Sequence, residues 1–219
     1  WEVIFKNYIP RMKFLGRGPA VNIYASKGCP YKCFYYCVYP LQQGRKLRIK
    51  SPQKVIDEMI YFYNKLKVEN FIFRDPVFSL NRQHTLELCE KLINHSLKFN
   101  ICVETHLKNI DDDLAKLMQK AGIKLVYVGI ETSDENVKTN VNRSSEHNDL
   151  QIKKIEFLQK IGIDVKAMYI VGLPTDTEKT YKETLSFAKK VSSTYAQFSV
   201  FTPYPGTPVF KEYQDKLTT

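Results

Sequence analysis

The sequence predicts an α/β fold of the open (β/α)6 type, a partial TIM barrel whose six parallel strands do not close. Six short apolar segments alternate with longer segments in which apolar residues recur every three or four positions. Strict alternation of this kind is typical of a parallel sheet with right-handed helical crossovers. Two junctions are near copies, Ala121-Gly122-Ile123-Lys124 and Ile161-Gly162-Ile163-Asp164. Six strands are too few for a closed eight-stranded barrel, and 219 residues suit one domain.

The first predicted unit follows an irregular start. Residues 1–20 have no lasting period and begin with Trp1, so we interpret them as a lead-in from a missing N-terminal region. Residues 21–26 alternate apolar and polar side chains and predict the first strand, which runs into a cysteine-rich loop. Ser51-Pro52 is a typical helix start, and an apolar stripe continues that helix to residue 66.

The later units repeat this pattern. Asn81 and Asp111 are placed to cap the next two helices, and a polar connection leads to a helix over residues 150–161. Thr175 and Glu178 predict a capping box for the last helix of the barrel. We expect the barrel core to span residues 21–202 and a C-terminal extension to begin within residues 203–219. The remaining strands are expected at residues 70–74, 99–104, 124–130, 164–171 and 195–201.

Three of the five cysteines lie in the loop after the first predicted strand. Cys29, Cys33 and Cys37 have the spacing C-x3-C-x3-C. Three thiolates this close can hold three irons of a [4Fe–4S] cluster and leave the fourth iron open. Cys89 and Cys102 lie far downstream, and we expect them to be packing residues. The loop position also puts the three cysteines at the C-terminal edge of the sheet, where barrel enzymes carry their working loops.

Other kinds of cysteine site fit less well. A structural zinc site needs a second close pair of cysteines or histidines, and the four histidines are scattered. An odd number of cysteines and no recognisable secretory segment argue against disulfides and favour a reducing cytoplasm. Zinc binding nevertheless stays open as an alternative.

The formal net charge of +10 permits a nucleic-acid partner. The lysines are spread over nearly every predicted helix, so we favour a solvated surface instead. The densest basic group, residues 45–50, follows the cysteine loop and could meet an anionic substrate or a cofactor phosphate. No apolar run is long enough to predict a membrane span.

Alternation along the predicted strands places a series of polar residues inside the barrel. A carboxylate at the C-terminal end of a barrel strand commonly serves a functional site, so Glu104 and Glu131 are candidate cofactor-binding residues. Each could instead form a structural ion pair, and the residue at 106 could face either the cavity or solvent. The inner positions are Cys102, Glu104, His106, Tyr127, Gly129, Glu131, Gln197 and Ser199.

The loop from Gly28 to Cys37 resembles that of the radical S-adenosylmethionine (radical SAM) superfamily. The usual spacing there is C-x3-C-x2-C with an aromatic residue before the last cysteine, as Tyr36 is here. One extra residue separates the second and third cysteines. We expect it to bulge outward, so that deleting Tyr35 would leave the cluster and SAM cleavage intact.

Further segments resemble strand ends of one radical SAM subgroup. That subgroup often carries an N-terminal cobalamin-binding domain and includes methyltransferases and a tetrapyrrole ring cyclase. These strand ends are residues 73–76, 104–107, 128–131 and 171–174, and residues 38–40 and 201–208 strengthen the similarity.

The resemblance implies that the three cysteines of the loop hold a [4Fe–4S] cluster whose fourth iron binds SAM. It places the backbone of Tyr36 beside adenine and Asp75 at the SAM amino group, although the usual Gly-Gly-Glu is absent. It also assigns Glu131 to the ribose or amino-acid part of SAM, Arg143 to its carboxylate, and Gly172 to a close approach by adenine.

By the same resemblance, the protein should cleave SAM reductively to methionine and a 5'-deoxyadenosyl radical, with electrons from flavodoxin or ferredoxin. We expect a methyltransferase of the cobalamin-dependent type or a relative, with cobalamin bound outside this segment and an unknown small-molecule or peptide substrate. Two alternatives are a non-catalytic iron–sulfur or zinc module with a degenerate loop, and a tRNA-modifying methylthiotransferase-like enzyme.

Overall fold

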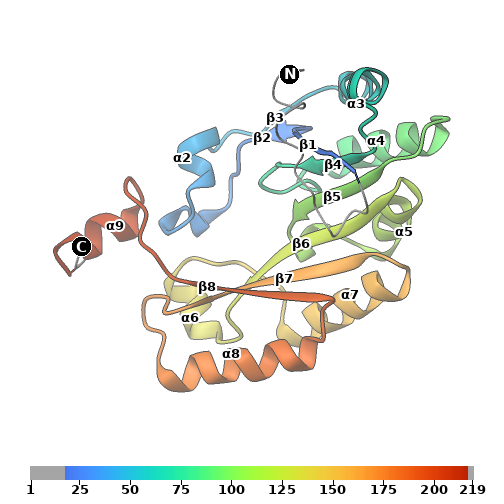
Figure 1. Cartoon of the computed structure of the whole chain (residues 1–219). Helices are drawn as coiled ribbons and strands as arrows, with labels where there is room; N and C mark the ends of the chain where they lie inside the picture. Colours follow the sequence, from blue (N-terminus) through green and yellow to red (C-terminus); the bar gives the residue numbers. More distant parts are fainter. Residues whose placement is uncertain (1–17, 217–219) are drawn as a thin grey trace.

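The computed structural model describes residues 18–216, so most of the lead-in predicted for residues 1–20 lies outside the described residues. Six parallel strands form one sheet in the order β1-β4-β5-β6-β7-β8, which is also their order along the chain. The edge strands β1 and β8 do not pair with each other, which confirms the predicted open (β/α)6 barrel (Figure 1). The strands are β1 Ala20–Ile23, β4 Asn70–Phe73, β5 Asn100–Thr105, β6 Ile123–Glu131, β7 Asp164–Val171 and β8 Tyr195–Val200.

Five longer helices pack on the outer face of this sheet (Figure 1). The predicted caps of the first three are confirmed, because the side chains of Ser51, Asn81 and Asp111 each accept a backbone N–H three residues on. These helices are α3 Pro52–Leu66, α4 Arg82–Asn94, α5 Asp112–Lys120, α7 Asn148–Lys160 and α8 Glu178–Val191.

The predicted capping box of α8 is wrong by two residues. The box joins Thr177 and Thr180, not Thr175 and Glu178. Thr175 has a left-handed backbone with φ of 70°, in a turn that Asp176 closes by donating its N–H to the Leu173 carbonyl, so the helix begins after that turn.

Several short elements were not predicted. The first strand breaks because Ala25 N–H donates to the Asp75 carboxylate (3.0 Å), and the chain then forms a small antiparallel pair of strands. The polar connection after β6 contains a helix, and further short helices follow the cysteines and β8. These elements are β2 Ser26–Lys27, β3 Arg48–Ile49, η1 Lys32–Tyr35, α2 Tyr39–Gln43, η2 Leu107–Asn109, α6 Glu135–Asn140, α9 Pro208–Tyr213 and η3 Gln214–Lys216.

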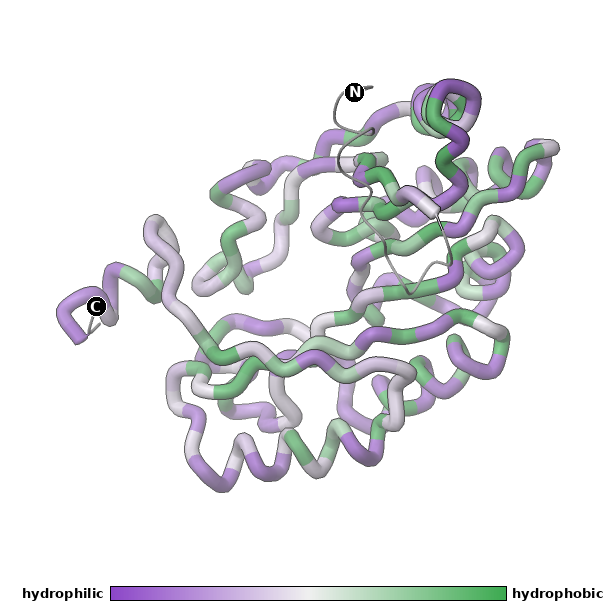
Figure 2. The backbone as a smooth tube through the Cα atoms, viewed as in Figure 1, coloured by the Kyte–Doolittle hydropathy of each residue, from purple (hydrophilic) through white to green (hydrophobic). Residues whose placement is uncertain are grey.

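The hydrophobic core lies mainly between the sheet and its helices, and Figure 2 shows the hydrophobic residues along the strands and on the inner sides of the helices. Cys89 on α4 is fully buried in this core. A small second cluster fills the barrel interior near the N-terminal ends of the strands and contains Cys102. Both cysteines are therefore packing residues, as predicted.

The predicted strand faces are also confirmed. Every second residue of β5 and β6 packs into the outer core, which leaves the intervening residues inside the barrel. The strand register then aligns Glu104, Tyr127, Lys166 and Tyr195 across four neighbouring strands. The outward residues are Ile101, Val103, Val126, Val128 and Ile130.

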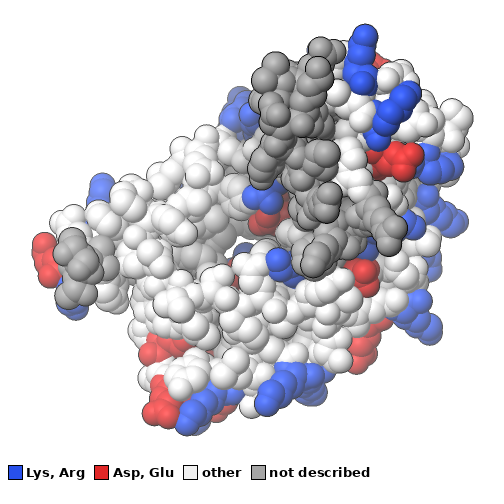
Figure 3. All heavy atoms as spheres, in the orientation of Figure 1, with Lys and Arg blue, Asp and Glu red and all other residues white. Residues whose placement is uncertain are grey.

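Charged side chains are dispersed over the surface. On the face in Figure 3, lysines and arginines stand mostly at the rim, with acidic residues among them. Several pair along their own helix, as Lys182 does with Glu178 (2.6 Å), in line with the predicted solvated surface. Among the described helices, none has the length and apolar character that a bilayer crossing requires.

Candidate active site

A cavity at the C-terminal edge of the sheet brings together most of the predicted site residues. All three cysteines of the loop line it, although they come from a segment outside the sheet. Predicted site residues from β5, from β6 and from the connection after α6 face it as well. Besides Cys29, Cys33 and Cys37, the lining consists of Tyr31, Tyr36, Tyr39, Pro76, Val77, Glu104, Thr105, His106, Gly129, Glu131, Arg143 and Met168.

Cys33 and Cys37 lie on one helical turn. The N–H groups of Tyr36 and Cys37 both donate to the Cys33 carbonyl, at 3.1 and 2.9 Å. Residues four apart on such a turn point to the same side, so both thiols reach the cavity. The extra residue of the C-x3-C-x3-C pattern therefore completes a turn. Phe34 and Tyr35 do not line the cavity, whereas Tyr36 and both cysteines do, as the predicted outward bulge requires.

The cysteine loop is fixed from both sides. Cys29 N–H donates to the Gly44 carbonyl (3.1 Å). Gly28 has a φ of 94°, and a Cβ there would lie 2.1 Å from the Lys46 carbonyl, so only glycine fits. On the other side, α9 packs against η1, and the Tyr35 hydroxyl donates to Glu212 (2.6 Å). Whether residues 203–219 begin a separate extension stays a prediction.

The donor set fits a [4Fe–4S] cluster. Three soft sulfur ligands face one cavity, whereas the two remaining cysteines are buried elsewhere in the barrel. Within residues 18–216, no three His, Cys, Asp or Glu side chains are arranged to hold a single metal ion. The cavity also has a polar group without a partner, because the buried Nε of Arg143 makes no hydrogen bond.

Glu131 and Arg143 form the polar wall of the cavity. Glu131 has a φ of 68°, next to the point where the β6–β7 register shifts, and its carboxylate lies 3.5 Å from Arg143 Nη2. Arg143 also donates to the Gly129 carbonyl. Burial raises the pKa of the Glu131 carboxyl, and the Arg143 guanidinium opposes part of that rise. For Arg143, burial favours a lower pKa, but Glu131 and neighbouring groups raise it overall.

Gly129 makes this arrangement possible. A Cβ at that position would lie 2.3 Å from Glu131 Oε1 and 2.9 Å from Arg143 Nη2. These separations are too short for a carbon atom, so the side chains occupy space that only glycine leaves free. Gly129 was predicted to face the barrel interior, but this role was not predicted.

Glu104 connects the sheet to the chain that follows the cysteines. Its carboxylate accepts a hydrogen bond from the Tyr39 hydroxyl (3.0 Å) on α2. Burial raises the pKa of Glu104, while the Tyr39 hydrogen bond and the charge of Arg74 act in the opposite direction. Tyr39 was not predicted as a site residue, although it belongs to the segment 38–40 that resembles the radical SAM subgroup.

His106 is buried and faces the cavity. Of its two predicted positions, the cavity is therefore the one observed, and the ring does not face solvent. The ring Nε2 donates to the Ser144 carbonyl (2.7 Å), and Nδ1 accepts from Lys108 N–H (3.1 Å). Burial, with help from the charge of Arg143, lowers the pKa of His106 to about 3. The neutral ring therefore holds the connection that presents Arg143.

Asp75 and Gly172 lie outside the cavity lining. Both Asp75 carboxylate oxygens are used internally, by Ala25 N–H (3.0 Å) and the Ser26 hydroxyl (2.6 Å). Gly172 N–H donates to Asp176 (2.9 Å) in the exposed turn after β7. Their assigned contacts with SAM stay predictions.

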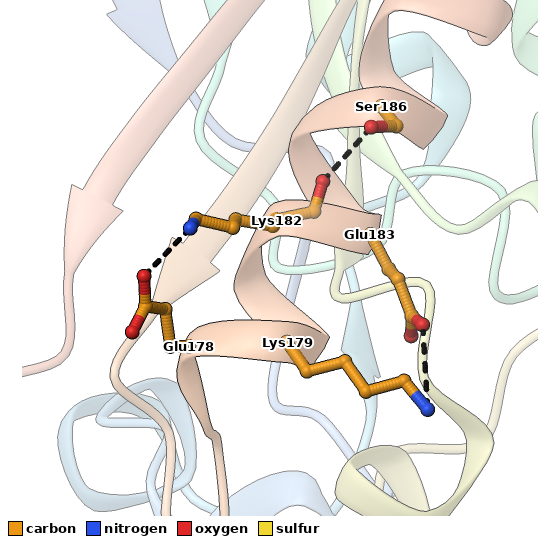
Figure 4. A pocket seen from close by; sticks show the side chains of 5 residues that line it. All are labelled: Glu178, Lys179, Lys182, Glu183 and Ser186. Carbon is orange, nitrogen blue, oxygen red and sulfur yellow. Dashed lines mark hydrogen bonds and ion pairs between the residues drawn. The ribbon is translucent and has the colours of Figure 1, made fainter.

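A separate hollow lies on the outer surface of α8 (Figure 4). Its charges pair within the same helix, Lys182 with Glu178 (2.6 Å) and Lys179 with Glu183 (3.9 Å). Ser186 donates to a carbonyl of the preceding turn. Pairs at this spacing are usual on a solvated helix, so we attach no function to this hollow.

A family model and two known relatives each match most of this chain. The family model described as "Radical SAM superfamily" matches residues 23–188. An uncharacterized methyltransferase of Pyrococcus horikoshii is 27% identical over 93% of this chain and 44% of its own length. The anaerobic magnesium-protoporphyrin IX monomethyl ester cyclase of Cereibacter sphaeroides is 31% identical over 99% of this chain and 35% of its own length. The chain thus spans less than half of these relatives.

A solved structure has the same fold. It is that of the radical S-adenosylmethionine methyltransferase TsrM from Kitasatospora setae with its tryptophan substrate and a SAM analogue bound. The TM-score is 0.82 at 19% identity, over 90% of this chain and 39% of that chain.

Proposed function

This chain belongs to the radical SAM superfamily, and we propose that it is the catalytic core of a radical SAM methyltransferase. The observation that carries the proposal is the cavity in which three cysteines face the Glu131–Arg143 pair. A cluster with one open iron requires three protein thiolates and a neighbouring site for the amino-acid part of SAM.

When bound, the cluster and SAM supply the electron transfer that cleaves SAM to methionine and a 5'-deoxyadenosyl radical. The protein's own residues position the reactants. Cys29, Cys33 and Cys37 would hold three irons. Arg143 is buried with a free Nε, so it would donate to the SAM carboxylate at little cost in side-chain ordering. Glu131 would accept hydrogen bonds from the amino or ribose groups of SAM.

Tyr36 and Glu104 complete the proposed cofactor site. Tyr36 belongs to the turn that carries Cys37, which supports a backbone contact with adenine. Glu104 is held in place by Tyr39 from the other side of the cavity. Asp75 and Gly172 do not line this cavity, and their contacts with SAM stay predictions.

The methyltransferase class is supported by relatives of that name, among them a bacteriochlorophyllide d methyltransferase of Chlorobaculum tepidum. We propose that cobalamin, if used, binds to a part of the protein outside these residues. The substrate would be a small molecule or peptide, the electron donor flavodoxin or ferredoxin, and the location the cytoplasm.

Anaerobic reconstitution followed by reduction tests this proposal. We expect SAM to be cleaved to 5'-deoxyadenosine, slowly even without substrate, and Glu131→Ala to weaken SAM binding more than Glu131→Gln. Lys153→Ala on α7 is an exposed control that should change nothing. A protein that binds iron but neither binds nor cleaves SAM would support the non-catalytic module instead.

A further inference from the structure

The segment that contains the cysteine loop carries only positive charge. No aspartate or glutamate occurs between Val3 and Ile56, although the chain as a whole contains 23 acidic residues. The basic residues from β2 to the start of α3 are Lys27, Lys32, Arg45, Lys46, Arg48, Lys50 and Lys54. Such one-sided charge contrasts with α8, where lysines pair with glutamates.

Part of this segment lies directly on the outer side of the cysteine loop. Arg45 donates to the Pro30 carbonyl (3.0 Å), and its guanidinium lies 4.7 Å from the centre of the Phe34 ring. Lys46, the residue after Arg45, also contacts this loop, because its carbonyl lies close to Gly28. In Figure 1, α2 stands apart from the helices that cover the sheet. Arg45 and Lys46 therefore lie where the cysteine loop meets solvent.

Most of these cations have no acidic partner. Among the ion pairs of residues 18–216, Lys50 pairs with Glu58, and the other cations from β2 to β3 take part in none. Their side chains are exposed, so their field extends into solvent. The residues in question are Lys27, Lys32, Arg45, Lys46 and Arg48.

Two large apolar side chains of this segment are exposed. Leu41 is 53% exposed and Ile49 is 49% exposed. Ile49 also lines a shallow hollow together with Lys27 and Arg48. Apolar side chains within a charged rim are typical of a surface that binds another protein, whereas nucleic-acid binding does not require them.

We infer that this surface docks an acidic one-electron carrier protein. We call it the basic loop face and define it by Lys27, Lys32, Arg45, Lys46, Arg48 and Ile49. The inference rests on the proposed function, which requires one electron for each SAM cleaved. The reduced cofactor of the carrier would lose that electron and the [4Fe–4S] cluster would gain it, with no bond formed and no proton transferred. A carrier docked here would approach the cysteine loop from outside and leave the cavity free for SAM.

Stopped-flow reduction of the reconstituted protein by flavodoxin hydroquinone tests the inference. The test variant is Lys27→Glu/Lys46→Glu, which leaves the hydrogen bonds of Arg45 and Arg48 in place. The matched control is Lys153→Glu/Lys160→Glu, the same charge change at exposed positions of α7. Electrostatic steering changes association rates by about 10- to 1000-fold. We therefore expect the test variant to be reduced at least about tenfold more slowly at low salt, with the difference shrinking at high salt.

Complete reduction by excess dithionite distinguishes a failure of the docking surface from a failure of the proposed function. If every variant takes up one electron from dithionite and only the test variant reacts slowly with flavodoxin, the docking surface is supported. Equal flavodoxin rates for the test variant and the wild type would overturn it, as would equal slowing in the control. If the test variant instead loses affinity for single-stranded RNA while its flavodoxin rate is unchanged, the surface binds nucleic acid and the inference is wrong. A protein that dithionite cannot reduce lacks the cluster, which is a failure of the proposed function.

Discussion

Replacing Gly129 by alanine tests whether SAM binding depends on the position of the Glu131 carboxylate. The added Cβ would lie 2.3 Å from Glu131 Oε1, so the carboxylate must retreat by about 1 Å to reach ordinary contact distance. The carboxylate is already 3.5 Å from Arg143 Nη2, and such a movement would break the pair. Gly129 has an ordinary strand backbone, so alanine itself adds no backbone strain.

The expected cost falls on SAM binding more than on folding. A hydrogen bond to a charged group contributes about 1.5–3 kcal/mol, which corresponds to about a 10- to 100-fold increase in the Kd of SAM. Overpacking of a core position costs about 1–3 kcal/mol in the free energy of unfolding. Because the displaced atom is the tip of a flexible side chain, we expect the lower end of that range.

Equilibrium dialysis with reconstituted protein gives the Kd, and thermal unfolding gives the stability. The control is the same substitution in a Glu131→Ala background, where the group that Gly129 accommodates is already absent. There, Gly129→Ala should cause little further loss of SAM affinity, because the two changes remove one interaction. Wild-type SAM affinity in Gly129→Ala alone, or fully additive losses in the double variant, would refute the reasoning.

The remaining predictions concern the cluster loop and His106. Alanine at any cysteine of the loop should abolish the roughly four irons bound per chain, whereas alanine at either of the other two cysteines should leave iron content unchanged. Deleting Tyr35 should leave iron binding intact, because residues three apart on a helical turn still point to the same side; loss of iron in the deletion, with iron retained in Tyr35→Phe, would contradict this. The pKa of His106 is about 6.5 in the unfolded chain and about 3 in the folded protein, so lowering the pH protonates the unfolded chain first. The free energy of unfolding should therefore fall by up to about 1.4 kcal/mol for each pH unit as the pH decreases from about 6.5 to about 3. Urea unfolding from pH 7.5 to 5 should show a shallower fall in His106→Gln, and equal slopes would count against a neutral buried ring.

Residues on regular strands were predicted well because strand geometry leaves little freedom. Alternation in β5 and β6 predicted that Glu104 and Glu131 face the interior, and both line the cavity. The spacing of the three cysteines predicted their convergence in the same way, since the contacts involved are local.

Residues outside regular elements were predicted less well, because tertiary contacts decide where their side chains point. Asp75 directly follows β4, and its carboxylate turns toward Ala25 and Ser26, which no pattern near residue 75 indicates. The short helices α2, α6 and α9 have five or six residues each, too few to show a helical period. Only a structure could place Tyr39 against Glu104.

The hydrogen bond between Tyr35 and Glu212 joins residues 177 positions apart. A ribosome adds about 5–20 residues per second, so Glu212 is synthesised about 10–35 s after Tyr35. During that interval the cysteine loop has emerged without α9, the helix that packs against it. Its thiols are then open to oxidation and exchange. We therefore expect cluster insertion to follow synthesis of α9, and the yield of loaded protein to depend on how well the cell keeps the nascent loop reduced.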